Sequence, residues 1–245
     1  MNLKYLITGT GRCGTVYMAR LLTSIGIPCG HETIFDYRGT RGARKRLLGE
    51  EPLRLSYVAS TSYNIHENKF HPIDWLPDIN MIVADSSYMA APFLRCDLLK
   101  DAKIIHVVRN PVDVVSSFCN HIDYFSNTPN PMNLVYETFI YRHIKQLKVD
   151  MPQYDRAALY YLRWNEMIEN QKPDFFFRVE DDPKDLLKFL GVPDDVEYFK
   201  DKKTNTLKKK DSPSFNWTQI ESRQIRKEFI EVSKKYGYDL YDCLI

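Results

Sequence analysis

Short apolar runs alternate with longer amphipathic stretches along most of the chain. Apolar runs that end abruptly in polar residues indicate buried strands, and the amphipathic stretches between them indicate helices packed on a parallel sheet. The runs predict strands at residues 3–8, 27–29, 81–84, 104–108 and 175–179. The amphipathic stretches predict helices at residues 15–24, 111–119, 155–170, 182–190 and 218–236. The chain is therefore expected to fold as an α/β protein with a central parallel sheet.

Two segments, residues 36–72 and 120–150, do not follow this alternation. Long irregular segments in compact domains tend to be functional, so both are interpreted as insertions or lids over a site. The chain has 245 residues and contains no internal repeat or low-complexity linker. A single domain over residues 1–245 is therefore expected.

Polar segments follow the predicted strands at one edge of the sheet. In an open parallel sheet, ligands bind beyond the carboxyl ends of the strands. The segments that reach this edge are residues 9–15, 30–33, 85–88, 109–117 and 178–181. Residues that bind or transform a ligand are expected in these five segments.

The first of these segments is rich in glycine and reads Gly9-Thr10-Gly11-Arg12-Cys13-Gly14. Glycines allow a tight turn that brings backbone N–H groups close to an anion, and the start of the following helix adds positive potential. The spacing fits a dinucleotide-binding loop with Glu32 on a ribose. It also fits a nucleoside-triphosphatase loop in which Thr15 and Val16 replace the usual Lys and Ser or Thr. In a third interpretation, Arg12 supplies the charge of the missing lysine.

A second candidate phosphate site follows the predicted strand at residues 104–108. Arg109 stands at the end of this strand, where a guanidinium can bind an anion through two parallel N–H groups. Asn110 and Pro111 then predict the cap and the first position of a helix. Ser117 lies about two turns into that helix, so its hydroxyl can reach the same anion.

Together the two segments resemble the sulfotransferases that use 3′-phosphoadenosine 5′-phosphosulfate (PAPS). The glycine loop is similar to the family's loop for the 5′-phosphosulfate, with Arg12 at its basic position and Tyr17 at its aromatic position. Arg109 and Ser117 match the pair that holds the 3′-phosphate. The resemblance implies that PAPS is bound by Gly11, Arg12, Cys13, Gly14, Thr15, Val16, Tyr17, Arg109 and Ser117. It also implies a three-layer α/β/α fold like that of P-loop nucleoside triphosphatases, and no metal.

Later passages resemble the same family less closely. Phe177-Arg178-Val179-Glu180-Asp181 is similar to its late strand, although Val179 replaces the usual Tyr. Trp164, on the preceding predicted helix, matches a tryptophan beside the adenine. Lys208 and Lys210 resemble the basic segment with which cytosolic members close the cofactor site, although the glycine of that segment is absent. The resemblance thus implies further cofactor contacts from Trp164, Lys208 and Lys210.

The activity implied by the resemblance is transfer of the sulfuryl group of PAPS to an acceptor hydroxyl or amine. Such an in-line displacement needs a base for the acceptor's proton and positive charge at the leaving phosphate. Cys29-Gly30-His31-Glu32-Thr33 is similar to a passage of tyrosylprotein-type sulfotransferases whose catalytic Glu maps onto Glu32. His31 is the alternative base, because other branches use a His and its ordinary pKa suits the task. Arg12 is expected to stabilise negative charge on the bridging oxygen.

One departure from the family concerns the end of the middle strand. Many members carry a Lys there, whereas this chain reads Val83-Ala84-Asp85-Ser86-Ser87. Three explanations stay open: Arg12 acts alone, another cation enters from a lid, or Asp85 has a different acid–base role.

Other classes of function also remain open at this point. They are a P-loop nucleotide kinase or hydrolase, an NAD(P)-binding oxidoreductase, and a non-catalytic anion-binding relative of the sulfotransferases. The acceptor is equally open, because no motif covers the irregular segments that would form its pocket. Sugars, lipids, peptides and small molecules all fit.

The overall charge is close to balance, with 34 Lys and Arg against 32 Asp and Glu. This argues against a protein that coats duplex nucleic acid. Positive charge gathers in residues 38–46 and 200–210. The first cluster is either a clamp for an anionic acceptor or cofactor, or a solvated loop.

No apolar run approaches the roughly 18–20 residues of a membrane span. The five cysteines include no C-x-x-C pair, which suits reduced thiols and a cytoplasmic location.

Overall fold

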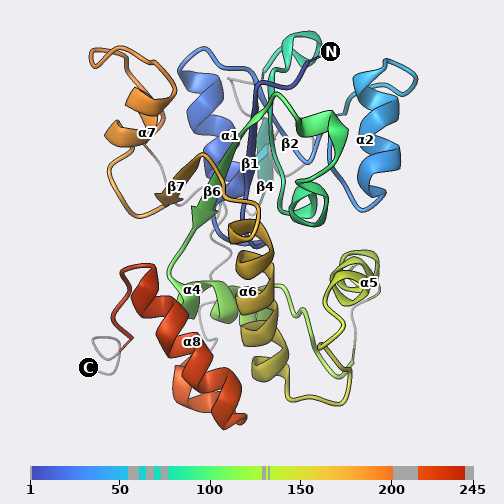
Figure 1. Ribbon diagram of the computed structural model, residues 1–245, viewed down its shortest axis with the longest axis vertical. Helices are drawn as coiled ribbons and strands as arrows, with labels where there is room; N and C mark the ends of the chain where they lie inside the picture. The colour runs from blue at the N-terminus through green and yellow to red at the C-terminus, as the bar shows by residue number, and fades with distance from the viewer. Residues whose placement is uncertain are drawn as a thin grey trace.

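The computed structural model describes residues 2–54, 61–64, 69–72, 77–128, 131, 133–200 and 215–240. Its centre is a sheet of five parallel strands in the order β2-β5-β1-β6-β7 (Figure 1). The strands are β1 (Tyr5–Thr8), β2 (Cys29–His31), β5 (Ala84–Ser86), β6 (Lys103–Val108) and β7 (Phe175–Arg178). The predicted α/β fold with a central parallel sheet is confirmed.

Helices cover both faces of this sheet. They are α1 (Thr15–Ser24) and α7 (Lys184–Phe189) on one face, and α6 (Gln153–Glu169) and α8 (Arg223–Lys235) on the other. Successive side chains of a strand point to opposite faces. Leu6 of β1 is accordingly buried with side chains of α6, whereas Ile7 is buried with side chains of α1. The three-layer α/β/α arrangement follows from these two cores.

The strand order places the glycine loop at the centre of the sheet edge. β1 is the middle strand, with β2 and β5 on one side and β6 and β7 on the other. The chain fills the first side before it crosses to the second, so the loop after β1 lies at a topological switch point. Ligands of open parallel sheets bind at such points.

Several boundaries differ from the predicted ones for identifiable reasons. β5 begins at Ala84 instead of residue 81 and contains Asp85 and Ser86, whose polar side chains are buried and hydrogen-bonded. The predicted helix at 111–119 is α4 (Pro111–Ser116), followed by a π-helical turn over Ser117–His121. α8 begins at Arg223 because the Ser222 hydroxyl caps it by accepting the Ile225 N–H.

The two segments expected to be irregular contain regular structure. Residues 36–72 include α2 (Gly39–Leu47) and an antiparallel hairpin of β3 (Thr61–Asn64) and β4 (Lys69–Pro72). Residues 120–150 include α5 (Leu134–His143). The expectation of irregular structure is therefore wrong at these elements. The sequence gives little sign of the two helices, because both are short and the arginines of α2 obscure its apolar positions. In Figure 1, α2 and α7 lie at opposite edges of the sheet.

The described part of the chain has no helix long and apolar enough to cross a lipid bilayer.

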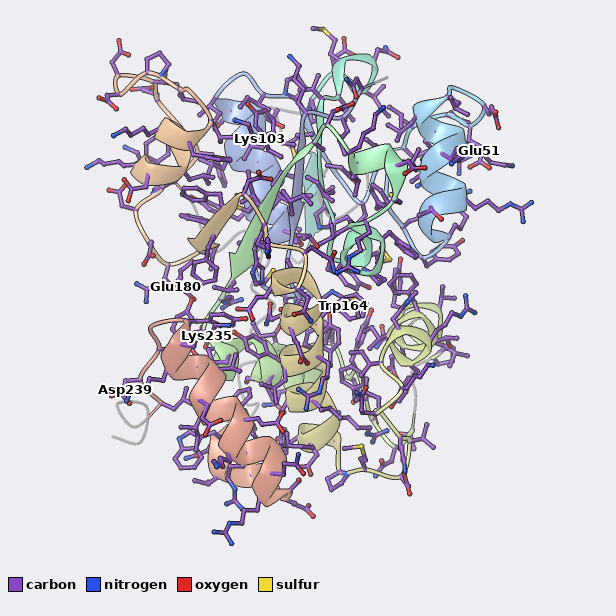
Figure 2. The ribbon with its side chains drawn as sticks, viewed as in Figure 1. Glu51, Lys103, Trp164, Glu180, Lys235 and Asp239 are labelled. Carbon is purple, nitrogen blue, oxygen red and sulfur yellow. The ribbon has the colours of Figure 1, made fainter. Side chains whose placement is uncertain are left out.

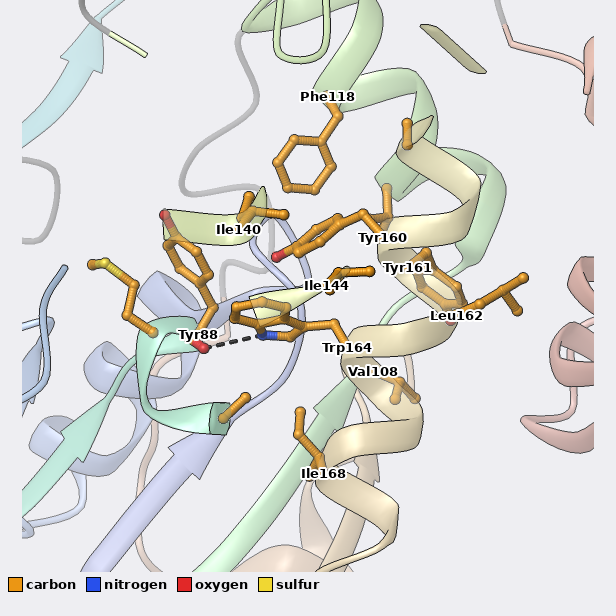
Figure 3. Close-up of a cluster of buried hydrophobic side chains, with 14 of the residues drawn as sticks. Tyr88, Val108, Phe118, Ile140, Ile144, Tyr160, Tyr161, Leu162, Trp164 and Ile168 are labelled. Carbon is orange, nitrogen blue, oxygen red and sulfur yellow. Dashed lines mark hydrogen bonds between the residues drawn. The ribbon is translucent and has the colours of Figure 1, made fainter. Parts of the chain in front are cut away.

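Trp164 lies at the centre of an aromatic cluster between α6 and the turn at Tyr88 (Figure 3). Its side chain is 0% exposed, and its indole N–H donates to the Tyr88 carbonyl oxygen at 3.1 Å. The rings of Tyr160 and Tyr88 lie 5.2 and 6.3 Å from it, centroid to centroid. Trp164 therefore belongs to the core on this side of the sheet.

We expect Trp164→Phe to lower the free energy of unfolding by about 2–4 kcal/mol, because it leaves a cavity and a buried Tyr88 carbonyl without its donor. Urea denaturation measures the loss. Trp217→Phe is the matched control, since the Trp217 N–H also donates to a carbonyl, that of Leu240, but at a partly exposed position. Equal losses in the two variants would contradict the core assignment of Trp164.

Candidate functional site

The glycine loop between β1 and α1 packs tightly on the neighbouring strands. A Cβ at Gly9 would lie 2.1 Å from the Val107 carbonyl oxygen, and a Cβ at Gly14 would lie 2.7 Å from a methyl group of Val179. Gly14 also has a φ of 101°, in the left-handed region that favours glycine. α1 starts directly after the loop and has no acidic residue in its first turn. The positive end of α1 therefore faces the ligand edge, and none of the side chains in its first turn is acidic.

Two arginines and a serine meet beside this loop. Arg12 Nε donates to Ser117 Oγ at 2.8 Å, and Arg109 Nη1 donates to the Arg12 carbonyl oxygen at 3.4 Å. Arg109 Nη2 pairs with Asp113 at 3.2 Å. These residues come from the loop after β1, the end of β6 and the turn after α4. The fold thus brings together the three side chains that the sequence predicts at a phosphate.

The proximity of the two guanidinium groups has an electrostatic consequence. Burial, followed by the positive charge of Arg109, lowers the pKa of Arg12 to about 10. Arg12 stays protonated at neutral pH and faces a like charge. An anion that contacts both groups would relieve this repulsion, so the pair favours a phosphate or sulfate ligand.

Glu180, at the end of β7, holds the turn that carries Arg109. One of its carboxylate oxygens accepts the Asn110 N–H at 2.9 Å, and the other accepts the Tyr238 hydroxyl at 2.6 Å. Figure 2 shows Glu180 between β7 and the end of α8 at Lys235. The late strand therefore acts on the site through Glu180, by fixing the position of Arg109.

His31 ends β2 and lies beside the start of α1. Its Nε2 is hydrogen-bonded to Thr15 Oγ1 at 3.1 Å, and the side chain is buried. Burial and the positive charges of Arg20 and Arg12 lower the pKa of His31 to about 3. The ring is therefore neutral at physiological pH and a poor proton acceptor.

Glu32 follows at the start of the turn after β2, in a left-handed conformation with a φ of 54°. Its side chain is 18% exposed, and its carboxylate lies 4.0 Å from His31 Nε2. Burial and the negative charges of Asp85 and Asp36 raise the pKa of Glu32 to about 8. A base should have a pKa near the working pH, so Glu32 suits the role better than His31.

Asp85 holds the turn that carries Glu32. Its buried carboxylate accepts three consecutive backbone N–H groups, from Thr33 at 3.0 Å, Ile34 at 3.2 Å and Phe35 at 2.9 Å. Burial raises the pKa of Asp85 to about 7, while the three N–H groups lower it. Because three donors converge on two oxygens, the ionised form is the one that the turn stabilises.

Ser86 and Ser87 extend the same clamp. Ser86 Oγ donates to the Thr15 carbonyl oxygen, and Ser87 Oγ donates to the Phe35 carbonyl oxygen, both at 2.8 Å. The stretch in which many sulfotransferases carry a Lys thus connects the start of α1 to the Glu32 turn. The contacts of Asp85 hold the turn that carries Glu32.

A cavity of about 460 Å³ opens beside Glu32. Its walls come from the Glu32 turn, from α2 and the segment after it, and from α5. Most of its lining residues are charged or aromatic: Asp36, Tyr37, Arg38, Arg46, Glu51, Arg54 and Tyr136. In Figure 2, Glu51 marks this side of the molecule beside α2. The cavity is the space from which an acceptor could reach Glu32.

Some residues expected at the cofactor lie elsewhere. The expected adenine contact of Trp164 is wrong, because its side chain is enclosed in the core and its N–H is already bonded to Tyr88. The side chains of Cys13 and Tyr17 are buried, which leaves their backbone as the part that faces the loop's ligand edge. Lys208 and Lys210 lie outside the described residues.

Two features of the site have no signal in the sequence. The Tyr160 hydroxyl of α6 accepts the Gly11 N–H at 2.8 Å and so helps to hold the glycine loop in place. α2 forms a wall of the Glu32 cavity, anchored by the buried Arg46, which donates to the Ile34 carbonyl oxygen and pairs with Asp36. Both contacts depend on tertiary packing, which no local motif encodes.

A family model for the sulfotransferase domain matches residues 3–236. The match includes the glycine loop, the end of β6 and the late strand β7. The chain therefore belongs to the sulfotransferase domain family, whose chemistry is sulfuryl transfer. A search of curated protein sequences finds no significant match.

We expect Asp85→Asn to lower the free energy of unfolding by about 2–4 kcal/mol, because an amide NH₂ would face at least one backbone N–H that the carboxylate now accepts. Asp101→Asn is the control at an exposed position and should change stability by less than about 0.5 kcal/mol. Urea denaturation of both variants measures the difference. An unchanged stability of Asp85→Asn would contradict the clamp.

Proposed function

We propose that this protein transfers the sulfuryl group of PAPS to a hydroxyl or amine of an acceptor. One observation carries the proposal. Arg12, Arg109 and Ser117 converge at the glycine loop, while Glu32, with its raised pKa, stands at the neighbouring strand end. Positive charge for a leaving phosphate and a base for an acceptor proton are thus available at one edge of the sheet.

The residues at the loop suit a nucleotide with two separate anionic groups. The start of α1 and Arg12 would hold the 5′-phosphosulfate, and Arg109 with Ser117 would hold the 3′-phosphate. A magnesium-bound nucleoside triphosphate fits less well, because Thr15 replaces the phosphate-binding Lys of that loop and Val16, which has no hydroxyl, replaces its magnesium-binding Ser or Thr. This difference favours PAPS over ATP as the cofactor.

The chemical step follows from these positions. PAPS supplies a sulfuryl group activated by its bond to the 5′-phosphate. Glu32 accepts the acceptor's proton as the acceptor oxygen or nitrogen bonds to sulfur, and the bond from sulfur to the phosphate oxygen breaks. Arg12 stabilises the negative charge that this leaves on the phosphate. The products are the sulfated acceptor and adenosine 3′,5′-bisphosphate.

We expect adenosine 3′,5′-bisphosphate to bind the wild-type protein in calorimetric titration, and Arg109→Ala to weaken binding by about 10- to 100-fold, the usual value of a charge-assisted contact. Arg223→Ala, on the exposed face of α8, is the control and should bind like the wild type. Absence of binding by the wild type would end the proposal. Wild-type affinity in Arg109→Ala would remove Arg109 from its assigned role.

The raised pKa of Glu32 predicts the pH dependence of the reaction. Only the ionised carboxylate accepts a proton, so kcat/KM should rise with pH and level off above about 8. Glu32→Gln should lose this rising limb together with about 10²- to 10⁴-fold of the rate. His31→Asn should retain the limb, since His31 is neutral throughout this range. A limb that survives in Glu32→Gln would transfer the role of the base to another group.

A non-catalytic anion-binding relative is the second candidate function, favoured by the absence of a Lys at the end of β5. Transfer of labelled sulfate from PAPS to any acceptor would exclude it. Binding of adenosine 3′,5′-bisphosphate without turnover of PAPS across an acceptor panel would support it instead.

A further inference from the structure

The chain reverses its direction directly after α8, and Tyr238 lies in this turn. The Tyr238 N–H donates to the Ser233 carbonyl oxygen at 2.9 Å. The Gly237 N–H donates to the Lys234 carbonyl oxygen at 3.0 Å, and Gly237 has a φ of 80°. These features define a Schellman motif, which ends a helix and turns the chain back. The turn brings Tyr238 to the end of β7, where its hydroxyl meets Glu180.

Arg178, the last residue of β7, holds this turn against the sheet. Its Nη1 donates to the Gly237 carbonyl oxygen at 2.9 Å, and its guanidinium carbon lies 5.4 Å from the centre of the Tyr238 ring. Its Nη2 pairs with Asp181 at 2.6 Å. A Cβ at Gly237 would lie 2.6 Å from Arg178 Nη1, so the turn and the arginine are in direct contact. The turn after α8 is thus fixed at the carboxyl end of β7.

The hydroxyl of Tyr238 orients the carboxylate of Glu180. It donates to one carboxylate oxygen at 2.6 Å, a length typical of a charge-assisted bond. Burial and the Glu180 carboxylate raise the pKa of Tyr238, so its hydroxyl stays protonated and remains the donor. The other oxygen of Glu180 accepts the Asn110 N–H at 2.9 Å. Tyr238 is therefore connected through Glu180 to the residue that follows Arg109.

The peptides on both sides of the Arg109 Cα are held by hydrogen bonds. In the preceding peptide, the Val108 carbonyl oxygen accepts the Val179 N–H at 2.9 Å. In the following peptide, the Arg109 carbonyl oxygen accepts the Tyr161 hydroxyl at 3.2 Å. The N–H of that same peptide belongs to Asn110 and donates to the carboxylate described above. Because both peptide planes are fixed, the direction in which the Arg109 side chain leaves the backbone is fixed as well.

Removal of the Tyr238 hydroxyl would weaken this restraint. Glu180 would lose the donor that orients its carboxylate, and its bond to the Asn110 N–H would be less well defined. The peptide after Arg109 would then be held firmly at its carbonyl end only. A ligand would have to order the Arg109 side chain on binding, which lowers affinity.

We propose that Tyr238 is a positioning residue of the 3′-phosphate site, which acts through Glu180 on the backbone that directs Arg109 towards the ligand. This inference rests on the proposed function, in which Arg109 binds the 3′-phosphate of PAPS. It makes the turn after α8 a part of the cofactor site. Tyr238 lies two residues beyond the part of the chain that the family model matches, residues 3–236.

The test is a double-mutant cycle on the affinity for adenosine 3′,5′-bisphosphate, measured by calorimetric titration. Tyr238→Phe removes the hydroxyl and keeps the ring beside Arg178. Tyr236→Phe is the matched control, because it removes a hydroxyl from the same end of α8 that lies near Glu169. Arg109→Ala and Arg109→Ala/Tyr238→Phe complete the cycle. Urea denaturation records the stability of each variant.

We expect Tyr238→Phe to bind the nucleotide about three- to tenfold more weakly than the wild type, which is the usual cost of ordering one side chain. Tyr236→Phe should bind like the wild type. In the Arg109→Ala background, Tyr238→Phe should cause no further loss, because the tyrosine acts only through Arg109. A general loosening of the fold would instead weaken binding whether or not Arg109 is present.

Wild-type affinity in Tyr238→Phe would overturn the inference, as would an equal loss in Tyr236→Phe. A further loss in Arg109→Ala/Tyr238→Phe would also overturn it, since Tyr238 would then act independently of Arg109. In each of these cases the wild type still binds the nucleotide, so the proposed function would stand. Failure of the wild type to bind would instead refute the proposed function.

Discussion

The arrangement of the site depends on one buried carboxylate. Asp85 collects three consecutive backbone N–H groups, those of Thr33, Ile34 and Phe35, and thereby fixes a turn in which Glu32 has a left-handed conformation. Burial of a carboxylate is unfavourable unless such donors compensate it, so the turn and the charge stabilise each other. The same negative charge helps to raise the pKa of Glu32 to about 8. Asp85 thus holds the turn of the candidate base and, together with burial and Asp36, raises the proton affinity of that base.

Opposite charges are separated across the ligand edge. On the side of β6, Arg12 and Arg109 form a cationic pair that favours an anion. On the side of β5 and β2, burial and the negative charges of Asp85 and Asp36 keep the proton affinity of Glu32 high. Sulfuryl transfer needs this polarity, because negative charge develops on the leaving phosphate while a proton leaves the acceptor. The clamp formed by Ser86 joins the two sides, since it bonds the first residue of α1.

The sequence predicted the parts of this site that are local. The glycine loop, α1, Arg109 and Ser117 lie in short consecutive passages whose spacing reflects backbone geometry, and the structure brings them together. The expected contact of Trp164 with the cofactor is wrong. A match to a family motif on a helix does not show whether the side chain faces the ligand or the core. The clamp at Asp85 was unpredictable, since its partners lie some fifty residues earlier in the chain and are backbone groups. α2 was missed because its arginines hide the few apolar residues that anchor it.

A crystal structure of the complex with adenosine 3′,5′-bisphosphate tests the central claim most directly. The account predicts the 3′-phosphate at Arg109 and Ser117, the 5′-phosphate at Arg12 and the start of α1, and the Glu32 carboxylate facing the 5′-phosphate across the space left for the sulfuryl group. A nucleotide bound in the opposite direction, or bound away from the glycine loop, would contradict it.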